Sequence, residues 1–479
     1  MGNDSRYPYY LAGEPRHDGG ELVVADKSGG GGGEVRVAQA DRAAVGEAIT
    51  AAAGASQAMR RLPTHKRQAV LRHCARRVDE RREELAELLC IEAGKPITDA
   101  RGEVARLVET FRDAEREAGR ALAGEVLPMD LAERGEGHVG YTKRVPVGPC
   151  ALITPFNFPL NLVAHKVAPA IAAGCTFVVK PSPRTPLGAI VLGEILAETE
   201  LPRGAWSVVT CANEDAELLV TDERIKLLSF TGSDRVGWEL KRQAGKKRVL
   251  LELGGNAAVV VEPDADVADA VRRIAFGGLY QSGQSCISVQ RVYAHEAVYD
   301  ELRDRLVEHV RRDWPTGPAR DEATRVGPMI DDAAAERVAA WIAEAKQQGA
   351  RVLCGGDRDG VTHQATVIEN VSDDAKLMGE EAFGPVIVLA RYSDFGEALR
   401  RVNASRFGLQ AGLFTRDLGK AHRAWDELEV GAVLVNQIPS WRMDHMPYGG
   451  VKDSGLGREG ARWAIQEMTE LRMMVVRQM

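Results

Sequence analysis

Cys286 is the residue whose type and neighbours best suit nucleophilic chemistry. It lies in the run Gly283–Ser288, among small and polar residues that leave a sulfur accessible. Gly283 also lets the backbone approach a ligand closely. A thiolate is a strong nucleophile when a nearby base or charge lowers the pKa of the thiol. A lone cysteine is more often a small buried apolar residue, so the assignment depends on other segments.

Further reactive groups stand where short apolar runs end. Asn157, Lys180, Ser233 and Glu252 each follow such a run closely. An amide donates hydrogen bonds, an ammonium binds anions or hydroxyls, and a carboxylate can serve as a base. If the runs are parallel strands, their carboxyl ends form one ligand-binding edge of the sheet. No Gly-x-Gly-x-x-Gly pattern follows any run, so an ordinary Rossmann phosphate loop is not indicated.

The elements that must position these groups alternate between strand and helix, which predicts an α/β fold with a doubly wound parallel sheet. Ahead of this region, we expect helices near 43–56 and 98–122 and one long helix between Pro63 and Gly94. Residues 1–35 are predicted to be extended and rich in turns, with the pentaglycine Gly29–Gly33 as a turn or mobile loop. The expected strands are 150–153, 176–179, 206–209, 227–230, 249–251 and 258–261, with helices near 159–173, 186–199, 214–220 and 235–244.

Composition narrows the class of protein. The 479 residues are 44% hydrophobic and 27% charged with a net charge of −7, which predicts a soluble globular protein of two or three domains without a nucleic-acid footprint. No apolar run reaches the length of a membrane span, and residues 1–6 lack the apolar region of a signal peptide. The 7 cysteines are scattered without a Cys-x-x-Cys pair, which argues against disulfides and a structural metal site and favours the reducing cytoplasm.

Together and in this order, the strand-end motifs resemble the aldehyde dehydrogenase superfamily. The match continues through the Cys286 run, Glu380–Pro385, Asn436 and Pro447–Gly455, and covers nearly the whole chain from about residue 35. The resemblance implies a Rossmann-like cofactor domain, an α/β catalytic domain and a small β oligomerisation flap. The cofactor domain is expected to comprise residues 1–123 and 147–253, and the catalytic domain residues 254–452. The oligomerisation flap is expected to comprise residues 124–146 and 453–479. The resemblance also implies a homodimer or homotetramer, since the C-terminal strand expected near 466–479 would otherwise expose an unpaired edge.

The resemblance assigns three catalytic roles. Cys286 is the nucleophile that forms a thiohemiacetal with an aldehyde and then a thioester. Asn157 and the backbone N–H of Cys286 stabilise the oxyanion. Glu252 activates the water that cleaves the thioester. Glu252 also disfavours a CoA-acylating enzyme, whose relatives typically lack this carboxylate, and the complete catalytic set disfavours a non-catalytic homologue.

The resemblance also implies NAD as cofactor, with NADP as a second acceptor. Lys180 is expected to bind the adenosine ribose and Glu381 the nicotinamide ribose. Pro183 stands where strict NAD enzymes often carry Glu, and Arg184 beside it either pairs with the phosphate of NADP or is a solvated loop residue. The expected cofactor residues are Ile153, Thr154, Pro155, Phe156, Lys180, Ser182, Pro183, Gly232, Ser233, Val236, Leu253, Gly254, Glu381 and Phe383.

The residues Ser285 and Ile287 and the runs Asn161–Lys166 and Asp444–Pro447 are similar to those of the lactaldehyde-dehydrogenase-like branch. This branch includes glyceraldehyde-3-phosphate and phosphono-aldehyde dehydrogenases. The expected substrate residues are Arg106, Phe158, His165, Ser285, Ile287, Arg442 and His445. The four basic residues of this set come from three segments, and their convergence would suit a small aldehyde that carries phosphate, phosphonate or carboxylate. Two alternatives stay open: Arg106 pairs with Glu103 or Glu109, and the substrate is a neutral aldehyde similar to lactaldehyde.

Overall fold

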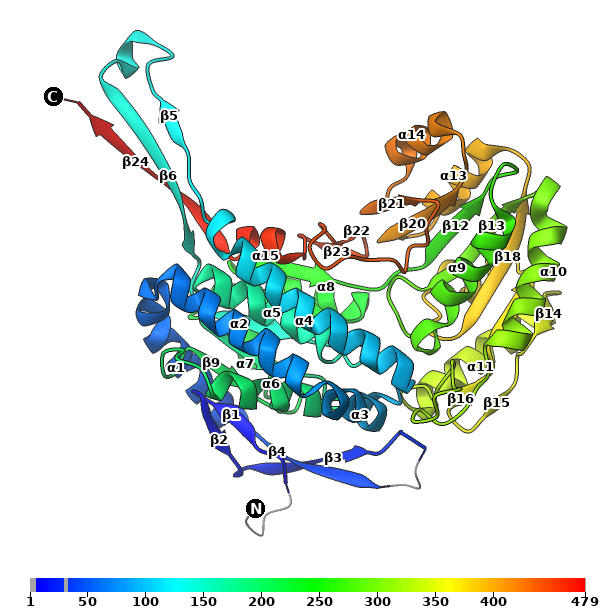
Figure 1. The fold of residues 1–479 in the computed structure, drawn as a ribbon, viewed down its shortest axis with the longest axis horizontal. Coiled ribbons are helices and arrows are strands. Elements are labelled where there is room, and N and C mark those ends of the chain that lie inside the picture. Colours follow the sequence, from blue (N-terminus) through cyan, green and yellow to red (C-terminus); the bar gives the residue numbers. More distant parts are fainter. Residues whose placement is uncertain (1–5, 30–32, 479) are drawn as a thin grey trace.

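The computed structural model describes residues 6–29 and 33–478. The predictions for residues 1–5 and for glycines 30–32 of the pentaglycine lie outside these residues. Two lobes, each built on a sheet with helices packed against it, form the body, and a long β arm projects from it (Figure 1). Within the described residues, no helix is both long and apolar enough to cross a membrane.

The first lobe contains an eight-stranded sheet whose central strands are parallel. Short antiparallel strands border it on both edges, which the sequence pattern did not predict. In spatial order the strands are β2 (Glu14–Arg16), β1 (Tyr9–Leu11), β9 (Trp206–Val208), β8 (Phe177–Lys180), β7 (Cys150–Ile153), β10 (Leu227–Thr231), β11 (Arg248–Glu252) and β23 (Gly455–Leu456).

Helices pack against both faces of this sheet because its strands alternate their buried side chains. Leu152 and Val179 face one core, and Ala151 and Val178 face the other. The helices of the lobe are α1 (Arg42–Arg61), α2 (Thr64–Glu80), α3 (Arg82–Ala93), α4 (Ile97–Arg120), α5 (Asn161–Ala173), α6 (Leu187–Ala197), α7 (Glu217–Thr221), α8 (Asp234–Gln243) and α15 (Ala461–Glu467).

The single helix predicted between Pro63 and Gly94 is wrong, because α2 and α3 are separated at Arg81. The backbone of Arg81 leaves helical geometry with φ −107° and ψ 24°. Arg81 binds Glu84 and also Glu194 on α6, with an Nη2 to Oε2 distance of 3.2 Å to Glu194. Arginine is a good helix former, so tertiary packing and not a local breaker makes this bend.

The second lobe contains a seven-stranded sheet, parallel except at β14. Residues 258–261 were predicted to complete the first sheet, but they form β12 at the heart of the second one. The chain crosses between lobes directly after Glu252, and β12 pairs with β13 and β20. The strands in order are β14 (Arg351–Cys354), β17 (Thr366–Glu369), β18 (Val386–Tyr392), β13 (Val289–His295), β12 (Ala257–Val261), β20 (Gln410–Phe414) and β21 (Ala432–Val435).

The second sheet also has a core on each face, with Val259 in one and Val260 in the other. Its helices are α9 (Val267–Leu279), η2 (Tyr280–Gly283), α10 (Glu296–Asp313), α11 (Asp332–Gln347), α12 (Lys376–Gly379), α13 (Phe395–Asn403) and α14 (Leu418–Glu427). Three strand pairs lie outside the large sheets: β3 (Gly20–Ala25) with β4 (Glu34–Gln39), β15 (Arg358–Asp359) with β16 (Thr362–His363), and β19 (Phe407–Gly408) with β22 (Val451–Lys452).

The projecting arm joins two distant parts of the chain (Figure 1). β24 (Thr469–Arg477) pairs antiparallel with β6 (His138–Pro146), β5 (Val126–Pro128) lies on the other side of β6, and η1 (Glu133–Gly135) turns between β5 and β6. Leu471 and Met474 of β24 are 63% and 58% exposed. Within residues 453–479, β23 extends the first sheet and α15 contacts α4 and α5, so only β24 belongs to the arm.

Candidate active site

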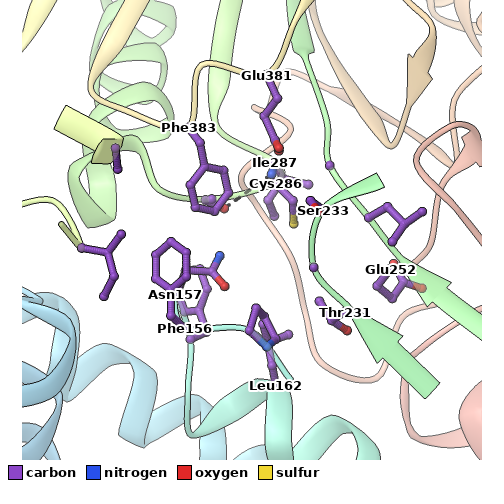
Figure 2. A pocket seen from close by; sticks show the side chains of 18 of the residues that line it. Phe156, Asn157, Leu162, Thr231, Ser233, Glu252, Cys286, Ile287, Glu381 and Phe383 are labelled. Carbon is purple, nitrogen blue, oxygen red and sulfur yellow. Dashed lines mark hydrogen bonds between the residues drawn. The ribbon is translucent and has the colours of Figure 1, made fainter. Parts of the chain in front are cut away.

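A cavity of about 400 Å³ lies between the two lobes. Its walls include the segments that follow β7, β10 and β11, as expected for the carboxyl edge of a doubly wound sheet. The second lobe contributes Cys286, Glu381 and Phe383 from the opposite side. Figure 2 shows these side chains around the same space as Asn157 and Glu252.

The loop that carries Cys286 is held in a strained shape. Gln281, Ser282 and Gly283 have φ values of 56°, 55° and 66°, the left-handed region that non-glycine residues avoid. The backbone N–H of Gln281 donates to Asp99 at 2.9 Å, and its side-chain amide donates to the Asn157 carbonyl at 3.1 Å. A Cβ at Gly283 would lie 2.1 Å from a backbone oxygen, so only glycine fits there. Packing from both lobes therefore fixes the position of Cys286.

Cys286 differs from the other cysteines in its exposure. It is partly accessible, whereas the other six are buried. Its Sγ lies 3.1 Å from the hydroxyl oxygen of Tyr448, and the Arg442 guanidinium lies 3.7 Å from the centre of the Tyr448 ring. Burial raises the pKa of the Cys286 thiol to about 12, while the Tyr448 hydrogen bond and the Arg442 charge act in the opposite direction.

Asn157 points its amide toward the cysteine loop. The residue is 4% exposed, and its Nδ2 donates to the Gln284 carbonyl at 3.0 Å. An amide nitrogen carries two hydrogens, so a second N–H stays available beside Cys286. This arrangement suits the stabilisation of negative charge on a carbonyl oxygen.

Glu252 ends β11 and presents an unusual carboxylate to the cavity. It is 4% exposed, and its buried Oε2 has no hydrogen-bond partner within the described residues. Burial and the negative charge of Glu459 raise the pKa of Glu252 well above its usual value, against the opposing charges of Arg442 and Lys166. A carboxylate with a raised pKa and a free oxygen is suited to general-base chemistry.

Arg106 reaches the cavity but does not pair with Glu103 or Glu109, as considered above. Its Nη2 lies 2.7 Å from Oδ1 of Asp444. Glu103 is instead buried against Lys95 and the backbone N–H groups that begin α5, and Glu109 pairs with Arg112 on the helix surface. The alternative that Arg106 pairs with an acid on its own helix was wrong, because its partner Asp444 lies on a loop far away in the sequence.

Arg442 is the second arginine in the cavity wall. Its side chain is 5% exposed, and its Nη2 lies 3.3 Å from Glu459 and 3.3 Å from Nδ1 of His165. Its buried Nε has no hydrogen-bond partner within the described residues. Thus one N–H donor of a desolvated guanidinium has no partner in a residue that lines the same cavity as Cys286.

The predicted substrate residues divide between the cavity and its surroundings. Arg106, Phe158, Ser285, Ile287 and Arg442 line the cavity. His165 and His445 are not among its lining residues. His165 is buried and bound to Asp444 at 2.8 Å, whereas His445 is exposed. The structure therefore brings two of the four basic groups to the cavity, and each is paired with its own protein carboxylate, Arg106 with Asp444 and Arg442 with Glu459.

The predicted cofactor residues divide in the same way. Eight of them line the cavity: Pro155, Phe156, Gly232, Ser233, Leu253, Gly254, Glu381 and Phe383. The lining does not include Ile153, Thr154, Lys180, Ser182, Pro183 and Val236. Lys180 lies at the end of β8, where its Nζ donates to Asn213 at 2.8 Å.

The lining fits an anionic dinucleotide. Ser233 lines the cavity directly before the first turn of α8, and its side chain makes no cap hydrogen bond to the amides of that turn. Helix-terminal amides of this kind bind phosphate. Glu381 accepts a hydrogen bond from the Gly255 N–H at 2.9 Å, and burial raises the pKa of its carboxyl group to about 7. A hydroxyl donor such as a ribose would satisfy this desolvated carboxyl group.

Sequence reasoning assigned no role to several residues that the structure places at the site. Tyr448 stood inside the quoted Pro447–Gly455 motif, and Asp444 lies beside the predicted substrate residue His445, so these positions were a usable signal. Glu459 and Tyr280 lie outside those motifs, and no local pattern marks them. Tyr280 lines the cavity, and Glu459 binds both Arg442 and Lys166 beneath it.

Comparisons with known proteins agree with this geometry. A family profile described as Aldehyde dehydrogenase family matches residues 31–474. The chain is 44% identical over 413 residues to the 3-sulfolactaldehyde dehydrogenase of Priestia aryabhattai, covering 86% of each chain. It is 39% identical to the lactaldehyde dehydrogenase of Methanococcus aeolicus, covering 90% and 92%. The fold is similar to crystalline aldehyde dehydrogenase 21 of Physcomitrella patens bound to the product succinate, with TM-score 0.96, 46% identity and coverage of 99% and 98%.

Proposed function

Because this chain belongs to the aldehyde dehydrogenase family, we propose that it oxidises a small anionic aldehyde to the corresponding acid. The chain is an NAD(P)-dependent oxidoreductase that acts on small aldehydes. The identity of the aldehyde, the roles of individual residues and the assembly are the proposed part.

Cys286 begins the reaction as the nucleophile. Its sulfur bonds to the aldehyde carbon, and the carbonyl electron pair moves to oxygen, which the Asn157 amide and the Cys286 backbone N–H stabilise. When bound, the nicotinamide cofactor supplies the oxidant that accepts hydride from this carbon. Ser233, Glu381 and Phe383, which line the cavity, would hold the cofactor there.

Glu252 completes turnover. Its free oxygen accepts a proton from water, whose oxygen attacks the thioester carbon. The carbon–sulfur bond then breaks, and the acid and the Cys286 thiolate are released. The presence of this carboxylate supports hydrolysis and not transfer of the acyl group to coenzyme A.

One observation supports an anionic substrate: Arg442 lines the same cavity as Cys286, and its buried Nε has no hydrogen-bond partner within the described residues. A buried donor without a partner costs about 1–3 kcal/mol, which an anionic oxygen would recover. Arg106 supplies a second guanidinium on the cavity wall. Guanidinium groups bind carboxylate, phosphate and sulfonate oxygens through paired N–H donors. One relative is named for the anionic aldehyde sulfolactaldehyde, and another was crystallised with the anion succinate as its reaction product.

A neutral aldehyde is the second candidate. Phe158 and Ile287 give the cavity apolar surface near Cys286, and one relative is named a lactaldehyde dehydrogenase. Both arginines already have protein carboxylates as partners, which lowers the positive charge open to a substrate. Kinetics with paired substrates separate the two candidates.

We further propose a homodimer or homotetramer that acts in the cytoplasm. The exposed apolar side chains of β24 are arranged along an unshared strand edge, which pairing with a second copy would cover. Light scattering of the purified protein would measure the assembly directly. A monomer at micromolar concentration would contradict the proposal.

Arg442→Ala tests the anionic substrate. We expect the KM for succinic semialdehyde to rise at least about tenfold, because one charge-assisted contact is lost, while the KM for the similarly sized neutral pentanal changes little. Arg112→Ala on the solvent side of α4 is the control. Equal changes of KM for both aldehydes would show that Arg442 is structural and would favour the neutral candidate.

A further inference from the structure

Tyr448 makes a contact with the reacting sulfur that the mechanism above does not use. Its hydroxyl oxygen lies 3.1 Å from Sγ of Cys286. Within the described residues, neither atom makes another side-chain hydrogen bond. The residue is 4% exposed, so water does not compete freely for its hydroxyl group.

The ring of Tyr448 is fixed in this position. The Tyr448 and Glu459 backbones exchange two hydrogen bonds, at 3.1 and 2.7 Å. The side chain packs with Ile287 and Leu409 in a small apolar cluster that also contacts Cys286. The Arg442 guanidinium covers one face of the ring at 3.7 Å from its centre. The hydroxyl group is therefore held beside the sulfur and cannot swing away without unpacking this cluster.

The direction of the hydrogen bond follows from acidity. Burial and the neighbouring Cys286 raise the pKa of Tyr448 well above its usual value, so its hydroxyl keeps its proton. The sulfur is the group that must ionise to react. Once Cys286 is a thiolate it can only accept, and Tyr448 is the donor. The cation over the ring withdraws electron density and strengthens that donor.

We propose that Tyr448 is a further catalytic residue, whose hydroxyl group donates a hydrogen bond to the Cys286 thiolate and stabilises it before attack on the aldehyde. The inference rests on the proposed role of Cys286 as the nucleophile. The hydrogen bond from Tyr448 would offset the desolvation that opposes thiolate formation at this partly buried position.

Tyr448→Phe removes the donor and keeps the ring, its packing and the backbone pairing. The rate of Cys286 alkylation by iodoacetamide, followed by mass spectrometry from pH 6 to 10, reports the thiolate fraction. We expect alkylation of Cys286 to slow about tenfold at each pH of this range, which corresponds to a rise of about one unit in the pKa of the thiol, as for the loss of one hydrogen bond to an ionised group. The acidic limb of the kcat/KM profile should shift in the same direction.

Tyr299→Phe is the matched control. This variant also loses one buried tyrosine hydroxyl contact in the second lobe, the 2.8 Å bond to Glu369, but it does not touch Cys286. Its alkylation profile should equal that of the unmodified protein. A shift of the same size in Tyr299→Phe would mean that the effect is general loosening of the lobe, which overturns the inference.

The outcomes also separate the inference from the proposed function. If Cys286 is alkylated identically in the unmodified protein and in Tyr448→Phe, the role of Tyr448 is wrong and the nucleophile stands. If Cys286→Ala retains aldehyde oxidation, the proposed function itself fails. A lower apparent pKa in Tyr448→Phe would show that Tyr448 accepts from the thiol, and this result also contradicts the proposal.

Discussion

Arg106 and Asp444 lie 338 residues apart in the chain and form a two-point ion pair at the cavity wall, with Nη2–Oδ1 and Nε–Oδ2 distances of 2.7 and 3.3 Å. The same carboxylate accepts a hydrogen bond from Nε2 of His165 at 2.8 Å. Asp444 thus joins α4, α5 and the loop that carries Arg442. This buried carboxylate is one of the contacts that hold the loop, together with the Arg442–Glu459 pair and the bond from Ser440 to the Ile287 carbonyl.

Asp444→Asn should destabilise the fold at neutral pH by about 1–2 kcal/mol, less than a fully buried pair would cost because Arg106 is partly exposed. Burial alone would raise the pKa of Asp444, but His165 and Arg106 hold it well below its usual range. A depressed folded-state pKa gives stability that is present above the unfolded value and lost as pH falls below it. Urea unfolding should therefore show a difference between variant and parent at pH 7 that shrinks below pH 4.

Glu109→Gln is the control for this measurement. Glu109 is an acid on α4, the helix that carries Arg106, and its side chain is 49% exposed and paired with Arg112. Its removal should change stability by less than about 0.5 kcal/mol. An equal loss in Glu109→Gln and Asp444→Asn would contradict the positioning role of Asp444.

Cys286→Ala should abolish aldehyde oxidation and leave cofactor binding nearly unchanged, because the thiol acts only on the carbonyl carbon. Fluorescence titration with NADH measures the binding. Cys354→Ala, in the core of the same lobe, should retain activity. Normal turnover in Cys286→Ala would remove the basis of the mechanism.

Glu252→Gln should separate the two halves of the reaction. We expect a burst of reduced cofactor followed by a collapse of steady-state turnover, because the thioester forms but is not hydrolysed. Asn157→Ala should instead slow the burst itself by about a hundredfold, as for other oxyanion donors. Stopped-flow absorbance at the NADH band distinguishes these results, and the same affected step in both variants would contradict the division of roles.

The Glu252→Gln substitution should also change the thermal stability of the protein in a pH-dependent way. The folded-state pKa of Glu252 is raised, so ionisation costs folding free energy as pH rises above the unfolded value near 4.5. The neutral glutamine avoids that cost. The melting temperature of the variant should exceed that of the parent at pH 8, and the two should agree near pH 4. A variant less stable than the parent at pH 8 would show that Glu252 is held by compensating contacts.

Much of the first lobe could be predicted because its strands are short apolar runs that alternate along the chain with helical segments. The strand at 150–153 appeared at the expected residues. The bend at Arg81 and the antiparallel edge strands could not be predicted, since tertiary contacts and not local signals make them. Glu252 and Ala257 are only five positions apart but lie in different sheets. The short linker between them contains no local sequence signal that predicts which sheet the next strand joins.

The site was predictable to the extent that its residues stand in motifs. Cys286, Glu252 and Asn157 meet at one cavity, which their spacing in the sequence did not imply. The partners of the arginines were not predictable, because Asp444 and Glu459 reach Arg106 and Arg442 only through tertiary packing. Charge counting alone therefore overstated the free positive charge at the substrate end.

Arg184 offers a test of cofactor preference. It lines the cavity, is 49% exposed and pairs with Asp331 at 2.6 Å, and no carboxylate stands at Pro183 to repel a 2′-phosphate. We expect use of both NAD and NADP, and a several-fold larger rise in KM for NADP than for NAD in Arg184→Ala. A preference for NAD above about a thousandfold in kcat/KM, equivalent to about 4 kcal/mol, would contradict this expectation.

The ratio of kcat/KM for anionic and neutral aldehydes in the unmodified enzyme tests the central claim most directly. Succinic semialdehyde and glyceraldehyde 3-phosphate should be compared with pentanal and lactaldehyde at fixed pH, salt and cofactor. The unused N–H of Arg442 and the second guanidinium of Arg106 predict a ratio of at least about ten in favour of one anionic substrate. Equal or faster turnover of both neutral aldehydes would contradict the claim and identify the arginines as structural.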